Sequence, residues 1–222
     1  MVVGGWASRR RCRGCPATEA TARFPPSRFA FRKLFLAAAL IAALPVLAPA
    51  VRAGIDFTPE TSFFELEGIR MPRLLFHDGN ATIAYVPPAG WTFAGGETKF
   101  RLTPREREDV TAFMQTVPQP VPMTLDEDGV KALRQAALNL VPQGSQEVKI
   151  VSEQKNPMLI GRHQTFEVCI SYVLKEHAYQ LNALFLDLDK SQVQFVVNAP
   201  KYGFEPVSTA FRKSLFSWQW LR

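Results

Sequence analysis

"QTFEVCISYVL", residues 164–174, alternates between apolar and other side chains, and this stretch determines the class of fold. An alternation with a period of two is typical of a β-strand that buries one face. The side chains on that face are those of Phe166, Val168, Ile170, Tyr172 and Leu174. Two more apolar runs follow after short polar links, at residues 179–188 and 192–199. Because parallel pairing needs a long crossover, three runs so close together predict an antiparallel meander.

Turn residues on the N-terminal side of the meander predict further strands. Asp78-Gly79 lies between two apolar runs and is a strong hairpin signal, because both residue types accept a positive φ. Gly95-Gly96 lies between two shorter runs and is interpreted as a second hairpin turn. Further strands are expected at residues 110–117 and 147–154, and residues 54–68 are interpreted as an arm or edge segment on the core.

Residues 124–141 predict a helix between these two groups of strands. Thr124, with Glu127 three residues later, fits a capping box that would satisfy the first backbone N–H groups. Pro142 ends the helical pattern. The expected apolar stripe, at helical spacing, consists of Val130, Leu133, Ala137 and Leu140.

A second helix is predicted over residues 203–220, with Pro206 in its first turn. Its apolar stripe is expected to pack on one face of the sheet. The stripe consists of Val207, Phe211, Leu215 and Trp218. The order strands, helix, strands, helix predicts an α+β fold, in which helices pack on an antiparallel sheet in two or three layers.

The apolar stretch "LFLAAALIAALPVLAPA", residues 34–50, carries no charge and follows Arg32-Lys33. A basic flank, a short apolar centre and small residues before a cleavage point are typical of a cleavable export signal. We expect residues 1–53 to be a leader that is removed after Ala53, and residues 54–222 to be a single domain. The expected location is the periplasm or the exterior of a bacterium. Three alternatives stay open: a retained membrane anchor, a helix buried in the core, and a two-part transit peptide leading to the thylakoid lumen.

Removing the leader changes the charge of the protein. The whole chain has a formal net charge of +6, but residues 1–53 contain nine basic residues and one acidic residue. Residues 54–222 therefore have 17 basic and 19 acidic residues, a net charge of −2. A nearly neutral domain lacks the basic stripe that neutralises phosphates, so no nucleic acid is expected as a partner.

The residue types that carry chemistry are few. Cys169 is the only cysteine of residues 54–222, and a small buried hydrophobe is its expected role. His77, His163 and His177 each lie beside turn-like sequence and would form a metal site only if the fold brought them together. We expect no catalytic residue, no cofactor and no metal. Among the tryptophans, Trp220 is the best candidate for a partner contact because it lies off the helical stripe, and Trp91 is the second.

The segment "IAYVPPAGW", residues 83–91, resembles the strand entry of domains of the PsbP and Mog1 fold, which include bacterial exported DcrB-like proteins. The later meander and the closing "FEPVSTAFRKSLFSW" are similar to that pattern too, so the resemblance covers about residues 69–220 in layout. It implies an α/β/α sandwich around an antiparallel sheet, and a binding or assembly factor rather than an enzyme. No functional residue is carried over. The "PQPVP" break at residues 118–122 and the segment 54–68 depart from the family layout.

Three hypotheses on function follow. The first is an exported non-catalytic binding or assembly module whose partner is another protein of the same compartment. The second is a cryptic hydrolase that uses Cys169 or paired acids. The third is a membrane-tethered form of the first, with residues 34–50 retained.

Overall fold

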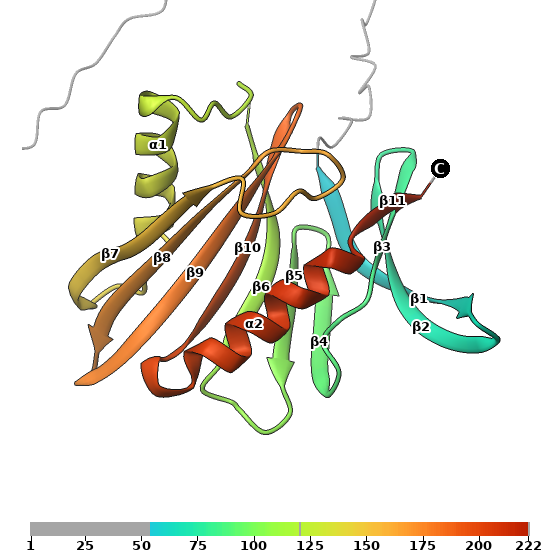
Figure 1. The fold of residues 1–222 in the computed structure, drawn as a ribbon, viewed down its shortest axis with the longest axis horizontal. Coiled ribbons are helices and arrows are strands. Elements are labelled where there is room, and N and C mark those ends of the chain that lie inside the picture. The colour runs from blue at the N-terminus through green and yellow to red at the C-terminus, as the bar shows by residue number, and fades with distance from the viewer. Residues whose placement is uncertain (1–53, 120, 222) are drawn as a thin grey trace, which may run out of the picture. The chain divides into compact units, whose positions relative to one another are not determined.

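The predicted meander is present in the computed structural model, which describes residues 54–119 and 121–221. Strands β8 (Thr165–Leu174), β9 (His177–Leu188) and β10 (Ser191–Pro200) are consecutive antiparallel neighbours (Figure 1). The links between them are short, as the alternating pattern predicted. The predictions for residues 1–53, including the export signal at 34–50, lie outside the described residues.

The meander belongs to a seven-stranded antiparallel sheet in the order β4-β5-β6-β10-β9-β8-β7. The pairing of β6 with β10 joins the two halves of this sheet, from Ser191↔Pro118 to Asn198↔Thr111. The remaining strands are β4 (Trp91–Gly96), β5 (Lys99–Pro104), β6 (Thr111–Pro118) and β7 (Gln146–Lys155). This pairing joins segments that are far apart in the chain, and no local pattern indicated it.

A second, four-stranded antiparallel sheet has the order β1-β2-β3-β11. Its strands are β1 (Ile55–Leu66), β2 (Ile69–Asp78), β3 (Ala81–Tyr85) and β11 (Gln219–Leu221). The interpretation of residues 54–68 as an edge segment is confirmed, since β1 is the outermost strand of this sheet. Two antiparallel sheets and two α-helices, α1 (Glu127–Leu138) and α2 (Phe204–Ser214), make the fold α+β and mainly β.

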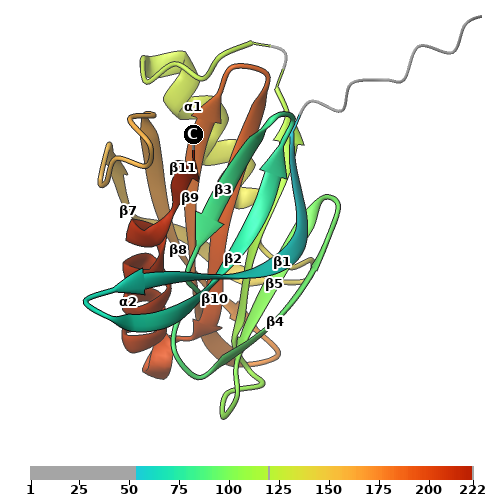
Figure 2. The ribbon, with the colours of Figure 1, turned by 90° about the vertical axis from the view of Figure 1, so that its right-hand side faces the viewer.

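Two separate cores show that the helices cover opposite faces of the seven-stranded sheet. Along β9, Ala183 and Phe185 are buried in the core that contains α1. The alternate residues Leu184 and Leu186 are buried in the core that contains α2 and the four-stranded sheet. Because side chains alternate across a strand, the sheet has one core on each face. Figure 2 shows the same unit from the side of β1 and β2.

The first helix begins at a different residue from the one predicted. Asp126 is the N-cap and its carboxylate accepts a hydrogen bond from the Gly129 N–H at 2.8 Å, while the Thr124 hydroxyl donates to Asp126 at 2.9 Å. The capping box of Thr124 with Glu127 is therefore wrong, since the capping group lies two residues further on. The stripe is confirmed in part. Val130, Leu133 and Ala137 are buried on the helix, whereas Leu140 packs beyond its end.

The second helix is shorter than predicted. It ends at Ser214, and a 3₁₀ turn, Leu215–Ser217, leads into β11. Val207, Phe211 and Leu215 are buried as expected. Trp218 is also buried, but from extended backbone rather than from a helical stripe.

Both predicted hairpins form, with loops that differ from the expected ones. Asp78 pairs with Ala81, so the first loop consists of Gly79 and Asn80. Gly95 pairs with Phe100 inside the hairpin of β4 and β5, so the interpretation of Gly95-Gly96 as a turn is wrong. This strand position requires glycine, because a Cβ at residue Gly95 would lie 2.2 Å from the carbonyl oxygen of Phe57 in β1.

Candidate functional site

Trp220, the leading candidate for a partner contact, lies in β11 opposite Ile83 of β3. Its indole is partly buried and packs beside Trp218 and His163, with ring centroids 6.1 and 5.2 Å apart. Gly161 lies against the same indole, and a Cβ at that glycine would be 2.2 Å from the ring. Most of the indole is thus engaged within the protein, and its role in a partner contact stays a prediction.

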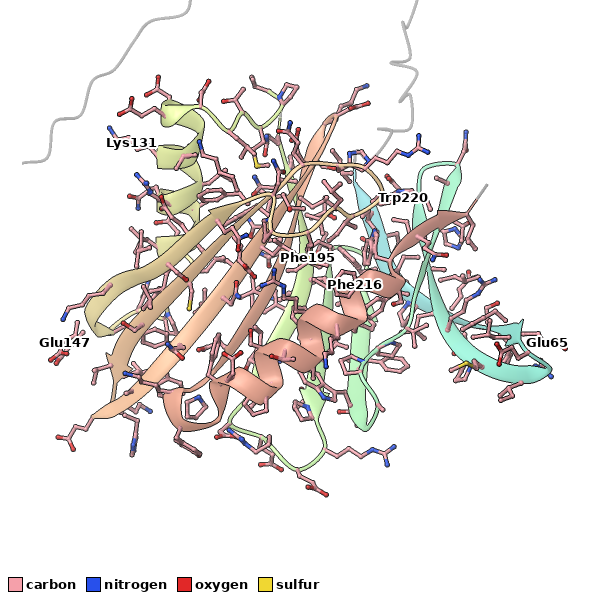
Figure 3. All side chains as sticks on the ribbon, viewed as in Figure 1. Glu65, Lys131, Glu147, Phe195, Phe216 and Trp220 are labelled. Carbon is pink, nitrogen blue, oxygen red and sulfur yellow. The ribbon has the colours of Figure 1, made fainter. Side chains whose placement is uncertain are left out.

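A shallow hollow of about 640 Å³ adjoins Trp220. Its rim carries two exposed apolar side chains, Leu159 at 69% and Phe216 at 67% exposure. Figure 3 labels Phe216 and Trp220, which come from the turn after α2 and from β11. The hollow is open, and Arg162, His163 and Gln219 also line it, so apolar and polar groups share its surface.

Trp91, the second candidate, begins β4 and packs against α2. Its ring stacks on that of Phe211 at 6.4 Å between centroids and an interplanar angle of 10°. The side chain is half-buried against the core. Trp91 therefore anchors the helix, and the structure does not bring it together with Trp220 in one site.

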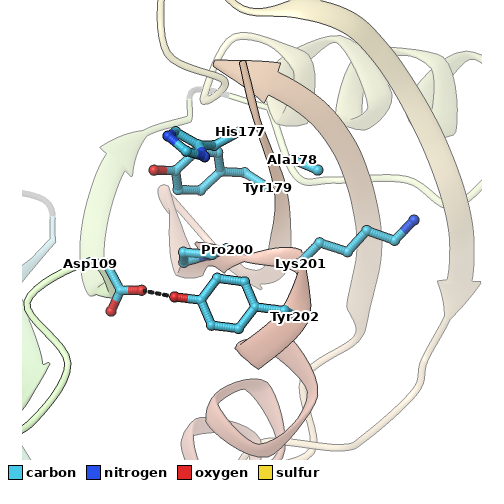
Figure 4. Close-up of a pocket in the computed structure, with 7 residues that line it drawn as sticks. All are labelled: Asp109, His177, Ala178, Tyr179, Pro200, Lys201 and Tyr202. Atoms are coloured by element: carbon cyan, nitrogen blue, oxygen red, sulfur yellow. Dashed lines mark hydrogen bonds between the residues drawn. The ribbon is translucent and has the colours of Figure 1, made fainter. Parts of the chain in front are cut away.

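Another hollow, of about 590 Å³, lies where β9 and β10 reach the turn before α2 (Figure 4). Tyr202, which is 85% exposed, donates a hydrogen bond to Asp109 at 3.2 Å. Asp109 is held on its other side by Arg107 at 2.8 Å. The hydrogen bond from Arg107 holds the pKa of Asp109 below its ordinary value, so this carboxylate stays ionised and is poorly suited to general acid catalysis.

The three histidines lie in separate surroundings. His77 of β2 faces Glu60 with 3.3 Å between Nε2 and Oε1, His163 packs on Trp220, and His177 lines the hollow of Figure 4. Within residues 54–119 and 121–221, no group of three or more His, Cys, Asp or Glu side chains is placed to hold a metal ion.

Cys169 faces the α2 side of the sheet and is half-buried. Burial raises the pKa of its thiol, and the carboxylates of Glu167 and Glu205 raise that pKa further. Glu167 itself is bound by Arg212 of α2 at 3.1 Å, so the helix covers this face. Because the thiolate is the nucleophile, a raised pKa opposes a catalytic role for this cysteine.

We expect native Cys169 to react with iodoacetamide several-fold more slowly at pH 8 than in urea-unfolded protein. Because the pKa of the native thiol is raised, less thiolate is present at a given pH than in the unfolded protein. As the pH increases, the native rate should therefore continue to rise at pH values where the unfolded rate has levelled off. Mass spectrometry of the Cys169 peptide separates it from Cys12 and Cys15. A native rate above the unfolded rate would instead support the hydrolase hypothesis.

Four exposed apolar side chains, Phe63, Leu66, Ile69 and Met71, lie on a hairpin that sequence reasoning did not single out. β1 and β2 pair from Glu60↔Leu75 to Leu66↔Ile69, but β3 pairs with β2 only from Leu74 onward. Residues 62–73 therefore form a two-stranded ribbon that extends beyond the sheet, with Glu65 near its tip in Figure 3. Two residues with positive φ, Glu67 and Gly68, close it.

The two faces of this ribbon differ. Cross-strand partners share a face, so Phe64 with Met71 and Leu66 with Ile69 lie together on one side. We call these four side chains the ribbon face. Leu66 is 56% exposed, Ile69 65% and Met71 38%. The other side continues into the core through Leu74 and carries Phe63 beneath the guanidinium of Arg70.

A signal for the ribbon exists in the sequence. "FFELEGIRM", residues 63–71, alternates on both sides of Glu67-Gly68, as a hairpin does. The scattered spacing of the aromatic residues in 54–68 hides this pattern when the segment is considered alone. The pattern does not reveal that the ribbon face is exposed. Alternation indicates that one side of a hairpin is apolar, whether or not another element covers that side.

No family model matches this sequence, and no curated protein matches it. Among solved structures, the chain is similar to the crystal structure of PA94, a protein of unknown function from Pseudomonas aeruginosa. The sequence identity is 8% and the TM-score 0.37, over 70% of this chain and 93% of that chain. In the part of the chain that the structure describes, no helix is both long and apolar enough to cross a bilayer.

Proposed function

We propose that the protein is an exported, non-catalytic binding or assembly module that acts by holding another protein. The ribbon face is the observation that carries this proposal. An apolar face on a protruding hairpin is costly in water unless a partner covers it, and contiguous exposed apolar patches mark interaction sites. Phe64, Leu66, Ile69 and Met71 form such a face on one side of the ribbon.

The chemistry of the remaining groups agrees with a binding role. Cys169 has a raised pKa, and Asp109 is neutralised by Arg107. Glu167, the acid two residues from Cys169, is bound by Arg212, which disfavours it as one of the paired acids of the hydrolase hypothesis. These features favour a module that presents a surface over one that activates a nucleophile.

The proposal includes an α/β/α sandwich of the PsbP and Mog1 type and a periplasmic or secreted location. The packing of α1 and α2 on opposite faces of the seven-stranded sheet supports the fold family. The four-stranded sheet that shares a core with α2 is an addition to that plan. The uncharged segment 34–50 behind a basic flank supports export.

A photo-crosslinking residue in the native host tests the binding role. Placed at Leu66, it is expected to give one adduct of discrete mass, because a bound partner lies against the ribbon face. The control is Val151 of β7, an exposed strand residue at 55% compared with 56% for Leu66. The same adduct at both positions, or none at Leu66, would contradict the proposal.

Leu66→Asp is expected to abolish that crosslink when the probe is placed at Ile69. Both side chains are exposed, so the free energy of unfolding should change by no more than about 0.5 kcal/mol. Val151→Asp is the matched control and should leave the Ile69 crosslink intact. A crosslink that survives Leu66→Asp would show that the ribbon face is not the binding surface.

A further inference from the structure

Resting on the proposed binding role, we propose that the occupant of the ribbon face is an amphipathic helix of a partner protein, with a carboxylate placed opposite Arg73. Three observations lead to this choice: the length of the ribbon, the prolines at its edges and the positive charge of Arg73. Each is a property of described residues in β1 and β2.

A packing partner of this kind would stabilise the ribbon. A two-stranded hairpin is marginal in water by itself and becomes stable when a helix or a third strand packs on it. Five residues of β1, from Ser62 to Leu66, extend over about 17 Å at about 3.4 Å per residue. A helix of about 11 residues has the same length at about 1.5 Å per residue.

The edges of the ribbon are poor sites for an added strand. The free edge of β2 contains Pro72, which has no backbone N–H to donate. On the other edge, β1 enters the ribbon through a register shift between Asp56 and Glu60, and Pro59 lies inside it. Proline and irregular pairing are the usual means by which edge strands resist further pairing. The side-chain face is thus the better docking surface.

Arg73 supplies the charge that the partner must complement. It pairs with Ser62 and lies on the same side as the ribbon face, with its guanidinium 5.8 Å from the ring centroid of Phe64. Its Nε atom is buried and has no hydrogen-bond partner among the described residues. Arg73 as a whole is only half-buried, so a partner carboxylate can approach the rest of its guanidinium and form a charge-assisted hydrogen bond there.

A lipid surface fits this site less well than a protein. The tip of the ribbon carries Glu65 and Glu67, next to the two most exposed side chains of the ribbon face, Leu66 and Ile69. Insertion would bring these carboxylates to an interface that is usually negatively charged. A protein helix can place its own polar residues beside them.

Selection of a displayed library of random 20-residue peptides on the full chain tests the inference. We expect the binders to carry apolar residues at helical spacing and at least one Asp or Glu, and to lose binding to Leu66→Asp. Arg73→Ala should weaken them by at least about tenfold, since a hydrogen bond between charged groups is lost. Arg70→Ala is the control, because Arg70 lies on the opposite side of the ribbon.

Each other outcome has a separate meaning. Binders that depend on Leu66 but alternate with a period of two, or that tolerate Arg73→Ala, overturn the helix and leave the binding role standing. Binders that all ignore Leu66→Asp overturn the helix, and the crosslink at Leu66 then decides the binding role independently. Ribbon-dependent binding of the full chain to vesicles of phosphatidylcholine and phosphatidylglycerol, without peptide binders, would replace the protein partner by a membrane.

Discussion

Replacing Trp218 by alanine is expected to lower the free energy of unfolding by about 3–5 kcal/mol, the range for truncating a large buried aromatic side chain. Trp218 is 3% exposed and lies at the point where the two sheets meet. Its ring packs against Phe76 at 6.0 Å and Tyr85 at 5.9 Å from the four-stranded sheet. On the other side it meets Phe195 of β10 edge-on, at 5.2 Å and 87°.

The indole nitrogen of Trp218 has no hydrogen-bond partner among the described residues, so the loss would come from packing and apolar burial. Urea denaturation followed by circular dichroism measures the change. Phe216→Ala is the control, because that ring is only two residues away and 67% exposed. We expect it to change stability by less than about 0.5 kcal/mol. A similar loss in both variants would contradict the central position of Trp218.

Gly95→Ala is expected to destabilise the protein by about 1–3 kcal/mol, the range for overpacking. A Cβ at Gly95 would lie 2.2 Å from the Phe57 carbonyl oxygen and 2.7 Å from Pro59 Cδ. Because one of these atoms is backbone, relief requires β1 to move away from β4. In an open strand position the same substitution would be favourable, since alanine loses less backbone entropy than glycine on folding.

Gly96→Ala provides the matched control in the same strand. No atom lies within 4 Å of a Cβ at that residue, so the substitution should be neutral or slightly stabilising. The difference between the two variants, measured by urea denaturation, reports the close approach of β1 to β4. Equal effects would show that β1 yields without cost.

For the candidate site, the sequence identifies residue types but not the tertiary contacts that they make. The sequence singles out Trp220 because it lies off the expected helical stripe, and Trp91 as the second candidate, and both contact neighbouring elements in the structure. Composition does not reveal whether an aromatic ring is used inside the protein or presented to a partner. The sequence does not reveal the ribbon face either, because its alternation is the same as that of any hairpin with one buried face.

Errors at the element ends also have local causes. Thr124 and Asp126 are both good capping residues, and only the path of the chain decides which carboxylate or hydroxyl meets the first free N–H. The apolar repeat that ends in Trp218 continues past the end of α2 because a 3₁₀ turn returns the tryptophan to the core. A periodic pattern records which side is buried, and different backbone conformations can satisfy it.

Local patterning alone settled the identity of most strands, both helices and the α+β class, because periods of two and of about 3.6 residues arise from contacts between near neighbours in the chain. Tertiary packing decided the rest. It paired β6 with β10, divided the strands between two sheets, placed Trp218 between them and left residues 62–73 protruding. These features depend on contacts between segments that are distant in the sequence, so the sequence of one segment alone does not determine them.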